Sequence, residues 1–232
     1  HWWFAYNDKS ARVVRSLGYP SDRLTVVQNA VDTAELREAR GRTTTASLDS
    51  LRAEFGINGQ NVAIVVGGMY AEKRLAFLIA AARAIRASVP DFELLVIGAG
   101  PDQGIVEAAT RDMSWLHYVG PRFGDIKAQL YMLAKVALLP GLVGLAVVDS
   151  FALEVPLVTI DLPFHSPEID YLQNGINGLI LPKDTDITAY AEVVGRVLQD
   201  ESLRQRLIVG CREAARCYTI ENMVKRFGEG VL

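Results

Sequence analysis

One carboxylate stands alone in an apolar stretch of this sequence. Between Lys135 and Glu154 the single charged residue is Asp149, which the pattern places inside a short apolar helix. An aspartate is rarely buried without a partner, so Asp149 needs a protein donor or a ligand hydroxyl. Gly141 and Gly144 leave backbone N–H groups bare where the helix begins, which suits a phosphate. Asp149 lies about 7 Å further along the helix at ~1.5 Å per residue, a spacing that fits a diphosphate with a ribose beside the carboxylate.

Two cations, Lys73 and Arg74, follow a glycine pair that ends at Gly68. Lys73 has the length to contact a diphosphate as a point charge, and Arg74 has Glu72 as a neighbouring partner. A solvated charged turn before a helix explains the same residues without a ligand. These residues alone leave both interpretations open.

Residues 165–168 (HSPE) form a second group of candidates, close behind an apolar strand. Ser166 suits a helix cap and Pro167 suits a first helical turn, so both have a structural explanation. Capping does not require His165 or Glu168. Those two side chains either contact the sugar of a ligand or are plain surface residues.

The segment VIGAGP, residues 96–101, invites comparison with the dinucleotide-binding fingerprint. After Gly98 and Gly100 the next glycine is Gly104, one residue late, and the motif follows the second strand of the alternation instead of the first. An NAD-dependent enzyme is therefore a minor alternative. The sequence has no Cys/His set with the spacing of metal ligands and no Gly-x-Ser-x-Gly motif. We expect neither a cofactor nor a metal.

A regular alternation of apolar strands and helices begins at residue 61 and positions these candidates. Strands about 25 residues apart with helices between them predict right-handed βαβ units. We expect a Rossmann-like, doubly wound parallel sheet of about six strands with helices on both faces. Glycines follow the first four strands, at the edge where open α/β sheets bind ligands. Tight turns explain any one of them, but the set favours a nucleotide-binding crevice.

Smaller elements precede the alternation. The pattern predicts a strand and a helix over residues 4–17, a short strand before Asn29, a helix over residues 33–40 and another over residues 48–55. The composition predicts a large core, because half of the 232 residues are hydrophobic. A formal net charge of −3 with both signs dispersed gives no footprint for nucleic acid.

The two cysteines, Cys211 and Cys217, fit reduced thiols in the cytoplasm. The sequence contains no run of ~18 apolar residues that would span a bilayer. It opens abruptly on HWWF without a methionine, so we expect a fragment of a longer protein.

Four segments together resemble the C-terminal, donor-binding domain of GT-B glycosyltransferases, especially glycosyltransferase family 4 of bacterial cell-surface polysaccharide synthesis. Residues 23–32 (RLTVVQNAVD) are similar to the family's interdomain segment Val-x-Asn-Gly-Val-Asp. The other three matches are residues 67–73 with Gly-Arg-Leu-x-x-Glu-Lys, residues 95–101 with Ile-Val-Gly-x-Gly-Pro, and residues 167–179 with Pro-Glu-Ile-x-x-x-x-Gly-x-Asn-Gly-Leu. The likeness covers nearly the whole chain.

The resemblance implies roles for single residues. In the family an arginine and a lysine of the first loop hold the donor diphosphate; here Lys73 matches, and Gly68 stands at the place of the arginine. The family's Glu-x7-Glu motif falls on residues 141–149. Its second acid, which binds the ribose hydroxyls, is Asp149, whereas the first acid, which faces the transferred sugar, is replaced by Gly141.

Further roles follow from the same resemblance. Gly144 and Leu145 match residues whose backbone amides meet the phosphates, and we place His165, Ser166 and Glu168 towards the sugar. The implied organisation is residues 1–28 as the end of an N-terminal domain with the interdomain segment, and residues 29–232 as the nucleotide-sugar-binding domain.

The implied activity is a retaining sugar transfer from a nucleotide diphosphate sugar to a cell-surface glycan or lipid-linked acceptor, at the inner face of the membrane. It would need the missing N-terminal domain, so the fragment alone is expected to be inactive. Two alternatives stay open because Gly68 and Gly141 depart from the family pattern: a non-catalytic or partner-dependent domain, and a UDP-sugar epimerase of the same architecture.

Overall fold

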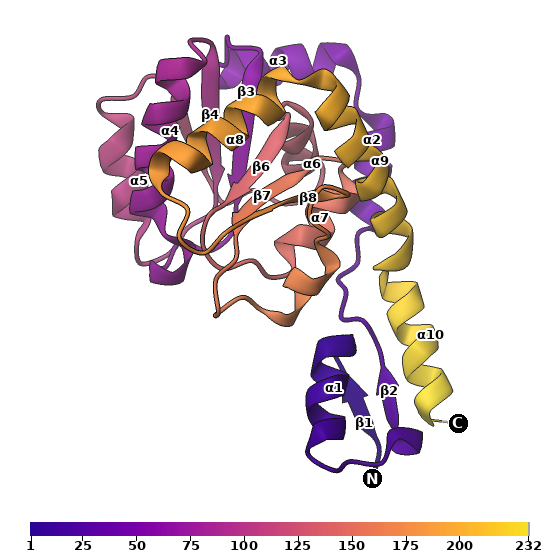
Figure 1. Cartoon of the computed structure of the whole chain (residues 1–232). Helices are drawn as coiled ribbons and strands as arrows, with labels where there is room; N and C mark the ends of the chain where they lie inside the picture. The colour runs from indigo at the N-terminus through magenta and orange to yellow at the C-terminus, as the bar shows by residue number, and fades with distance from the viewer. Residues whose placement is uncertain (232) are drawn as a thin grey trace.

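The computed structural model describes residues 1–231. The chain forms a six-stranded sheet in its main body and a two-stranded sheet in a small unit at the N-terminus. Figure 1 shows the small unit at one end of the main body, with the C-terminal helix beside it. Within the described residues, none of the helices has the length and apolar character needed to cross a membrane.

The main sheet is parallel throughout, with strand order β5-β4-β3-β6-β7-β8. Its strands are β3 (Asn61–Val66), β4 (Phe92–Ile97), β5 (Leu116–Gly120), β6 (Val136–Leu139), β7 (Leu157–Ile160) and β8 (Gly178–Leu181). The chain starts in the centre with β3, moves outward to β5, and returns to place β6 on the other side of β3. The predicted doubly wound sheet is confirmed, and its topological switch point lies between β3 and β6.

Two groups of helices enclose this sheet (Figure 1). In the first, α4 (Leu75–Ser88) packs on α5 (Gln103–Thr110) and α8 (Ile187–Gln199); in the second, α6 (Gly124–Met132) packs on α2 (Ala34–Arg42) and α3 (Thr45–Phe55). The short α7 (Ala146–Ala152) contacts α2 and the long α9 (Glu201–Cys217). Because both faces are covered, the strands are apolar runs, and every residue of β4 is buried.

Helix α3 begins three residues earlier than the apolar pattern predicts. Thr44 and Ser47 form a reciprocal capping box, in which each side chain accepts a hydrogen bond from the other's backbone N–H. The predicted polar loop is therefore shorter than expected. The helix ends as predicted at Gly56, which has the left-handed φ of 68°.

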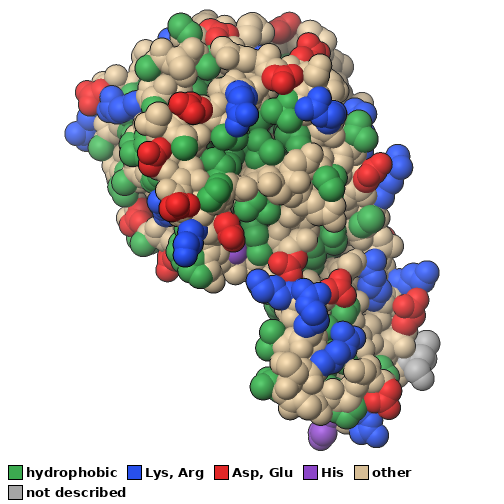
Figure 2. Space-filling view, in the orientation of Figure 1, with side chains coloured by type: hydrophobic (Ala, Val, Ile, Leu, Met, Phe, Trp, Pro, Cys, Tyr) green, Lys and Arg blue, Asp and Glu red, His purple; other side chains and the backbone are tan. Residues whose placement is uncertain are grey.

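The N-terminal unit comprises β1 (Trp3–Ala5), α1 (Asp8–Ser16), the 3₁₀ turn η1 (Ser21–Arg23) and β2 (Leu24–Val26). It has a small core of its own, separate from the main core. Helix α10 (Ile220–Val231) packs on β2, and the Phe227 ring stacks on Phe4 with 4.2 Å between centroids. In Figure 2, Lys and Arg side chains gather where this unit meets the main body. The domain division at residue 28 stays a prediction; residue 232 lies outside the described residues.

Candidate functional site

A cavity of about 700 Å³ opens at the carboxyl ends of β3, β4 and β5. Gly67 and Gly68 after β3 and Gly98 after β4 form part of its wall. The other lining residues come from the strand ends, the loop after β5, α6, the start of α7, and α2 with the segment before it: Val31, Asp32, Glu35, Leu36, Val66, Ile97, Ala99, Pro121, Arg122, Phe123, Gly124, Lys127, Leu145, Ala146 and Asp149. The sheet edge is thus hollowed where the glycines predict a crevice.

Asp149 lines this cavity and is paired with a cation that the sequence analysis missed. The Lys127 ammonium of α6 donates to Asp149 Oδ2 at 2.6 Å, and the two side chains are only 17% and 14% exposed. The other oxygen, Oδ1, accepts no hydrogen bond from residues 1–231. Burial, with the nearby charge of Asp149 as a smaller cause, raises the pKa of Tyr131. One carboxylate oxygen is therefore held by the protein and the other is free for a ligand hydroxyl.

The start of α7 presents bare amides, although the helix begins two residues later than Gly144. The N–H groups of Gly144, Leu145 and Ala146 donate to no acceptor within residues 1–231. Leu145 and Ala146 line the cavity, whereas the amide of Val143 is bonded to His165 Nδ1 at 3.0 Å. Unpaired donors at a helix start beside a cavity are the arrangement expected for an anion-binding site.

Lys73 is held by the loop that precedes α7. Its ammonium donates to the Leu142 carbonyl at 2.6 Å, and burial lowers the pKa of Lys73. In return the Leu142 amide donates to the Glu72 carbonyl at 2.8 Å, and Arg74 donates to the Pro140 carbonyl at 3.3 Å instead of pairing with Glu72. The loop after β3 is thus bound to the loop after β6.

This contact explains why a glycine stands at position 141. A Cβ on Gly141 would lie 2.5 Å from the carbonyl carbon of Lys73 and 2.7 Å from its Cα, and still closer to the Glu72 carbonyl oxygen. No side chain fits there while the two loops stay together. The acid that the family resemblance places at 141 has no room in this arrangement.

None of the three residues expected towards the sugar lines the main cavity. His165 accepts from Val143 through Nδ1 and bonds to the Ile160 carbonyl through Nε2 at 2.7 Å, and burial lowers its pKa. Glu168 is buried, and its carboxylate accepts from Asn29 at 2.6 Å. Their role towards a sugar stays a prediction.

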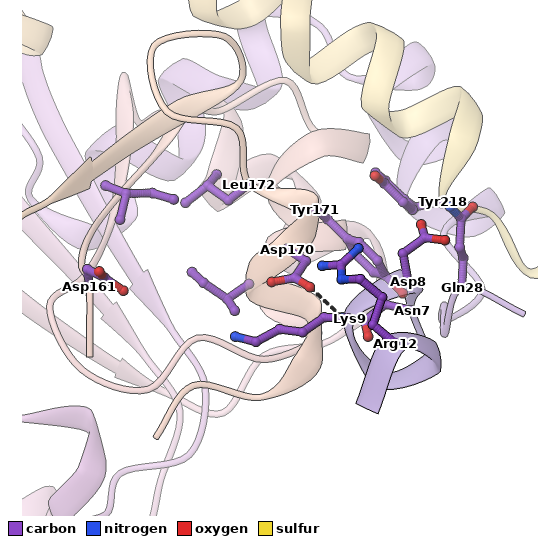
Figure 3. Close-up of a pocket in the computed structure, with 12 residues that line it drawn as sticks. Asn7, Asp8, Lys9, Arg12, Gln28, Asp161, Asp170, Tyr171, Leu172 and Tyr218 are labelled. Atoms are coloured by element: carbon purple, nitrogen blue, oxygen red, sulfur yellow. Dashed lines mark hydrogen bonds between the residues drawn. The ribbon is translucent and has the colours of Figure 1, made fainter. Parts of the chain in front are cut away.

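Ser166 lines a second cavity, of about 210 Å³, between α1 and the 3₁₀ turn η3 (Pro167–Tyr171). The sequence predicts a short α-helix there, and Pro167 stands at its start as expected. Figure 3 shows a neighbouring cavity of about 470 Å³ at the same junction, bordered by a hydrogen bond of 3.0 Å from Asn7 to Asp170. It shares no lining residue with the cavity at Asp149.

Comparison with known proteins decides the family. The family model described as glycosyl transferases group 1 matches residues 60–200, more than half of the chain. This chain belongs to the glycosyl transferases group 1. The match runs from β3 to the end of α8 and includes Lys127 and Asp149; the lining residues that precede residue 60 lie outside it. No curated protein sequence matches the chain.

Solved structures agree with the group 1 assignment at the level of the fold. HepE from Anabaena, solved in complex with UDP, matches with a TM-score of 0.76 and 15% identity over 98% of this chain and 62% of its own. A glycosyltransferase from Rickettsia africae matches with a TM-score of 0.77 and 12% identity; the match covers 97% of this chain and 61% of that protein. WaaG, a glycosyltransferase involved in lipopolysaccharide biosynthesis, is also covered over 61%, by 98% of this chain (TM-score 0.71, 17% identity). This group 1 chain thus spans about three-fifths of these structures, and its Rossmann-like GT-B C-terminal domain fold is as predicted.

Two features of the candidate site were not predicted from the sequence. Lys127 belongs to no sequence motif, and its position in the helix before β6 was the only feature that could have suggested a place near the site. Phe123, 80% exposed at the cavity wall, lies in a turn whose glycines have φ of 66° at Gly120 and 54° at Gly124. Among residues 1–231, no group of three or more His, Cys, Asp or Glu side chains is arranged to hold a metal.

Proposed function

We propose that this domain binds a nucleotide diphosphate sugar and forms the donor side of a retaining glycosyltransferase. One observation carries the proposal: the cavity at the switch point has Asp149 in its wall with one carboxylate oxygen free, close to the bare amides of residues 144–146. HepE, which shares this fold, has been solved with UDP and with UDP-glucose, which supports a uridine nucleotide as the first candidate.

In this proposal the nucleotide lies along the carboxyl edge of the sheet. The base occupies the apolar part of the cavity between Val66 and Ile97, and the ribose hydroxyls donate to Asp149 Oδ1. The diphosphate accepts from the amides of Gly144 and Leu145. In this arrangement the charged diphosphate lies near Gly68, which has no side chain to fill this part of the cavity.

The sugar then projects beyond the Gly144 turn. Lys73 reaches the diphosphate once its bond to the Leu142 carbonyl is exchanged. In this proposal His165, Ser166 and Glu168 are directed towards the sugar, and His165 and Ser166 line the neighbouring cavity of about 210 Å³. Transfer needs no metal in this scheme, because the phosphate charge is met by amides and ammonium groups.

The complete enzyme requires a further domain. We propose that residues 1–28 are the last part of an N-terminal acceptor domain, and that the acceptor is a cell-surface glycan or a lipid-linked glycan at the cytoplasmic face of a membrane. The free thiols of Cys211 and Cys217 suit that reducing compartment. The chain by itself would bind the donor without transferring its sugar.

Calorimetric titration of UDP-, GDP-, ADP- and dTDP-sugars into the chain tests the proposal. One of them should bind, and Asp149→Asn should weaken it about tenfold or more, as expected for a lost hydrogen bond to a charged group. Asp125→Asn is the matched control, because that carboxylate of α6 is 58% exposed, pairs with Arg42 and does not line the cavity. A folded chain that binds none of the four, or an Asp149→Asn variant with unchanged affinity, contradicts the proposal.

A second candidate, a non-catalytic partner domain with the same fold, is favoured by the packing at Gly141. The position of the family's first acid is closed by the backbone of Glu72 and Lys73. A transfer assay on the complete protein separates the two functions: sugar transfer excludes the non-catalytic candidate, and donor binding without transfer supports it.

A further inference from the structure

The charges of the main cavity leave one problem for an anionic nucleotide. Three acids line it, Asp32, Glu35 and Asp149, against two cations, Arg122 and Lys127, so the wall carries a net charge of −1. A diphosphate entering this cavity adds further negative charge beside Asp149. The field of the empty wall therefore opposes the ligand unless a cation is directed at the phosphates.

Of the two cations, Lys127 is the one that is bonded to Asp149. Arg122 donates instead to the carbonyl of Pro121, next to it in the chain, in a solvent-exposed hydrogen bond. The Lys127 side chain is 17% exposed and is fixed 2.6 Å from Asp149 Oδ2. Charge screening by water is weaker at such a half-enclosed position, so its ammonium acts more strongly on a neighbouring anion.

The ammonium of Lys127 also has donors to spare. A lysine has three N–H donors, and Lys127 makes one hydrogen bond within residues 1–231, to Asp149. Asp149 lies in the first turn of α7, which begins at Ala146, two residues after Gly144. Lys127 lines the same cavity as Asp149, Leu145 and Ala146, so a diphosphate between a ribose at Asp149 and these amides would lie beside the unused donors.

We propose that Lys127 is the phosphate-binding cation of this site, holding Asp149 towards the ribose with one donor and the nucleotide diphosphate with the others. The inference rests on the proposed function, since it concerns the same nucleotide. It replaces the charge that Gly68 lacks with a lysine from a different element, the helix α6. The already tethered Lys73 then supplements Lys127 and is not the main contact.

The test compares UDP with uridine, which has the same base and ribose but no phosphate. Lys127→Met should weaken UDP about tenfold or more, the loss expected for a hydrogen bond between charged groups. Uridine, which keeps only the contact of its ribose with Asp149, should lose affinity by a clearly smaller factor. Lys127→Arg should restore most of the UDP affinity. Raising the salt concentration should weaken UDP binding more in the wild type than in Lys127→Met.

Lys135→Met is the matched control. This lysine is also partly buried, and its ammonium bonds to Asn61 at 2.8 Å near the start of β6, outside the cavity. The variant should bind UDP as the wild type does. Thermal denaturation of all variants checks that they are folded. If Lys127→Met alone is unstable, the double variant Lys127→Met/Asp149→Asn, which removes both charges, takes its place. The double variant should bind UDP more weakly than Asp149→Asn alone.

The outcomes are separable. Equal losses of UDP and uridine in Lys127→Met would mean that the lysine only supports the fold of the cavity, and unchanged UDP affinity would mean that it has no role; either overturns the inference and leaves the proposed function intact. A wild-type chain that binds neither UDP nor any of the four nucleotide sugars overturns both.

Discussion

Replacing Gly141 by alanine is the sharpest test of how the two loops at the site are joined. The added methyl group would lie 2.5 Å from the Lys73 carbonyl carbon and 2.7 Å from its Cα, where ordinary contacts begin near 3.4 Å. Both obstacles are backbone atoms, so no side-chain rotation relieves the overlap. The loop of residues 70–74 has to move away from residues 140–142.

The size of the effect follows from what that movement breaks. Three hydrogen bonds join the loops: Leu142 N–H to the Glu72 carbonyl, Lys73 to the Leu142 carbonyl, and Arg74 to the Pro140 carbonyl. At about 1 kcal/mol for each of the three bonds, and about 1–3 kcal/mol for forced overpacking, the free energy of unfolding should fall by about 4–6 kcal/mol if all three bonds are lost.

Urea denaturation followed by circular dichroism measures this change. Gly104→Ala is the control, because a Cβ there meets no atom within 4 Å and the residue lies in α5; its unfolding free energy should stay the same or rise by up to about 1 kcal/mol. Gly141→Glu should be at least as harmful as Gly141→Ala, so restoring the family's acid would not restore its site. A Gly141→Ala chain within about 0.5 kcal/mol of the wild type would refute the packing argument.

Two further predictions concern stability. Glu154 has a left-handed φ of 59°, and its carboxylate binds Arg40 at 2.6 Å and Arg212 at 2.7 Å. Glu154→Gly and Glu154→Ala both lose these ion pairs, but only glycine relieves the backbone strain, so the free energy of unfolding should be about 1 kcal/mol higher for the glycine variant. Equal denaturation midpoints would argue against strain at this residue. Burial lowers the pKa of His165 below its ordinary 6.5. Between the two pKa values the unfolded chain therefore binds a proton that the folded chain does not. The contribution of His165 to stability is complete above pH 6.5 and should be lost as the pH falls towards the lowered pKa. Denaturation midpoints from pH 7.5 to 5 should therefore fall more steeply in the wild type than in His165→Asn. Parallel curves would show that folding does not lower the pKa of His165.

The fold was readable from the sequence because its signals are local and repeated. Apolar runs such as FELLVI in β4, separated by helices and followed by glycines, indicate parallel strands buried on both faces. The start of α3 was not readable in this way, since the capping box of Thr44 and Ser47 extends the helix into a polar stretch. Apolar periodicity records the buried face of a helix and is silent about its caps.

The sequence predicted the candidate site only where one residue differs in type from all of its neighbours. Asp149 is conspicuous in an apolar stretch, but its partner Lys127 lies 22 residues earlier on a different helix, and nothing near it in the chain marks the pairing. The contacts of His165 and Glu168 were equally hidden, because their partners are the Val143 amide and Asn29, distant in sequence. Such pairs arise from the topology of the sheet, which brings the ends of separate strands to one edge.

The departures at Gly68 and Gly141 belong to one structural change. Gly68 opens the loop after β3, and its Cβ position lies 2.9 Å from the Tyr70 ring; Gly141 lies in the loop after β6, and its Cβ position is filled by the loop after β3. A long side chain at 68 would have to displace Tyr70, and one at 141 would separate the loops. Glycine at both positions lets the loops close on each other, with Lys73 bonded across the gap to the Leu142 carbonyl. The resemblance implies an arginine at position 68, and we propose that Lys127 of α6, bonded to Asp149, supplies that positive charge instead.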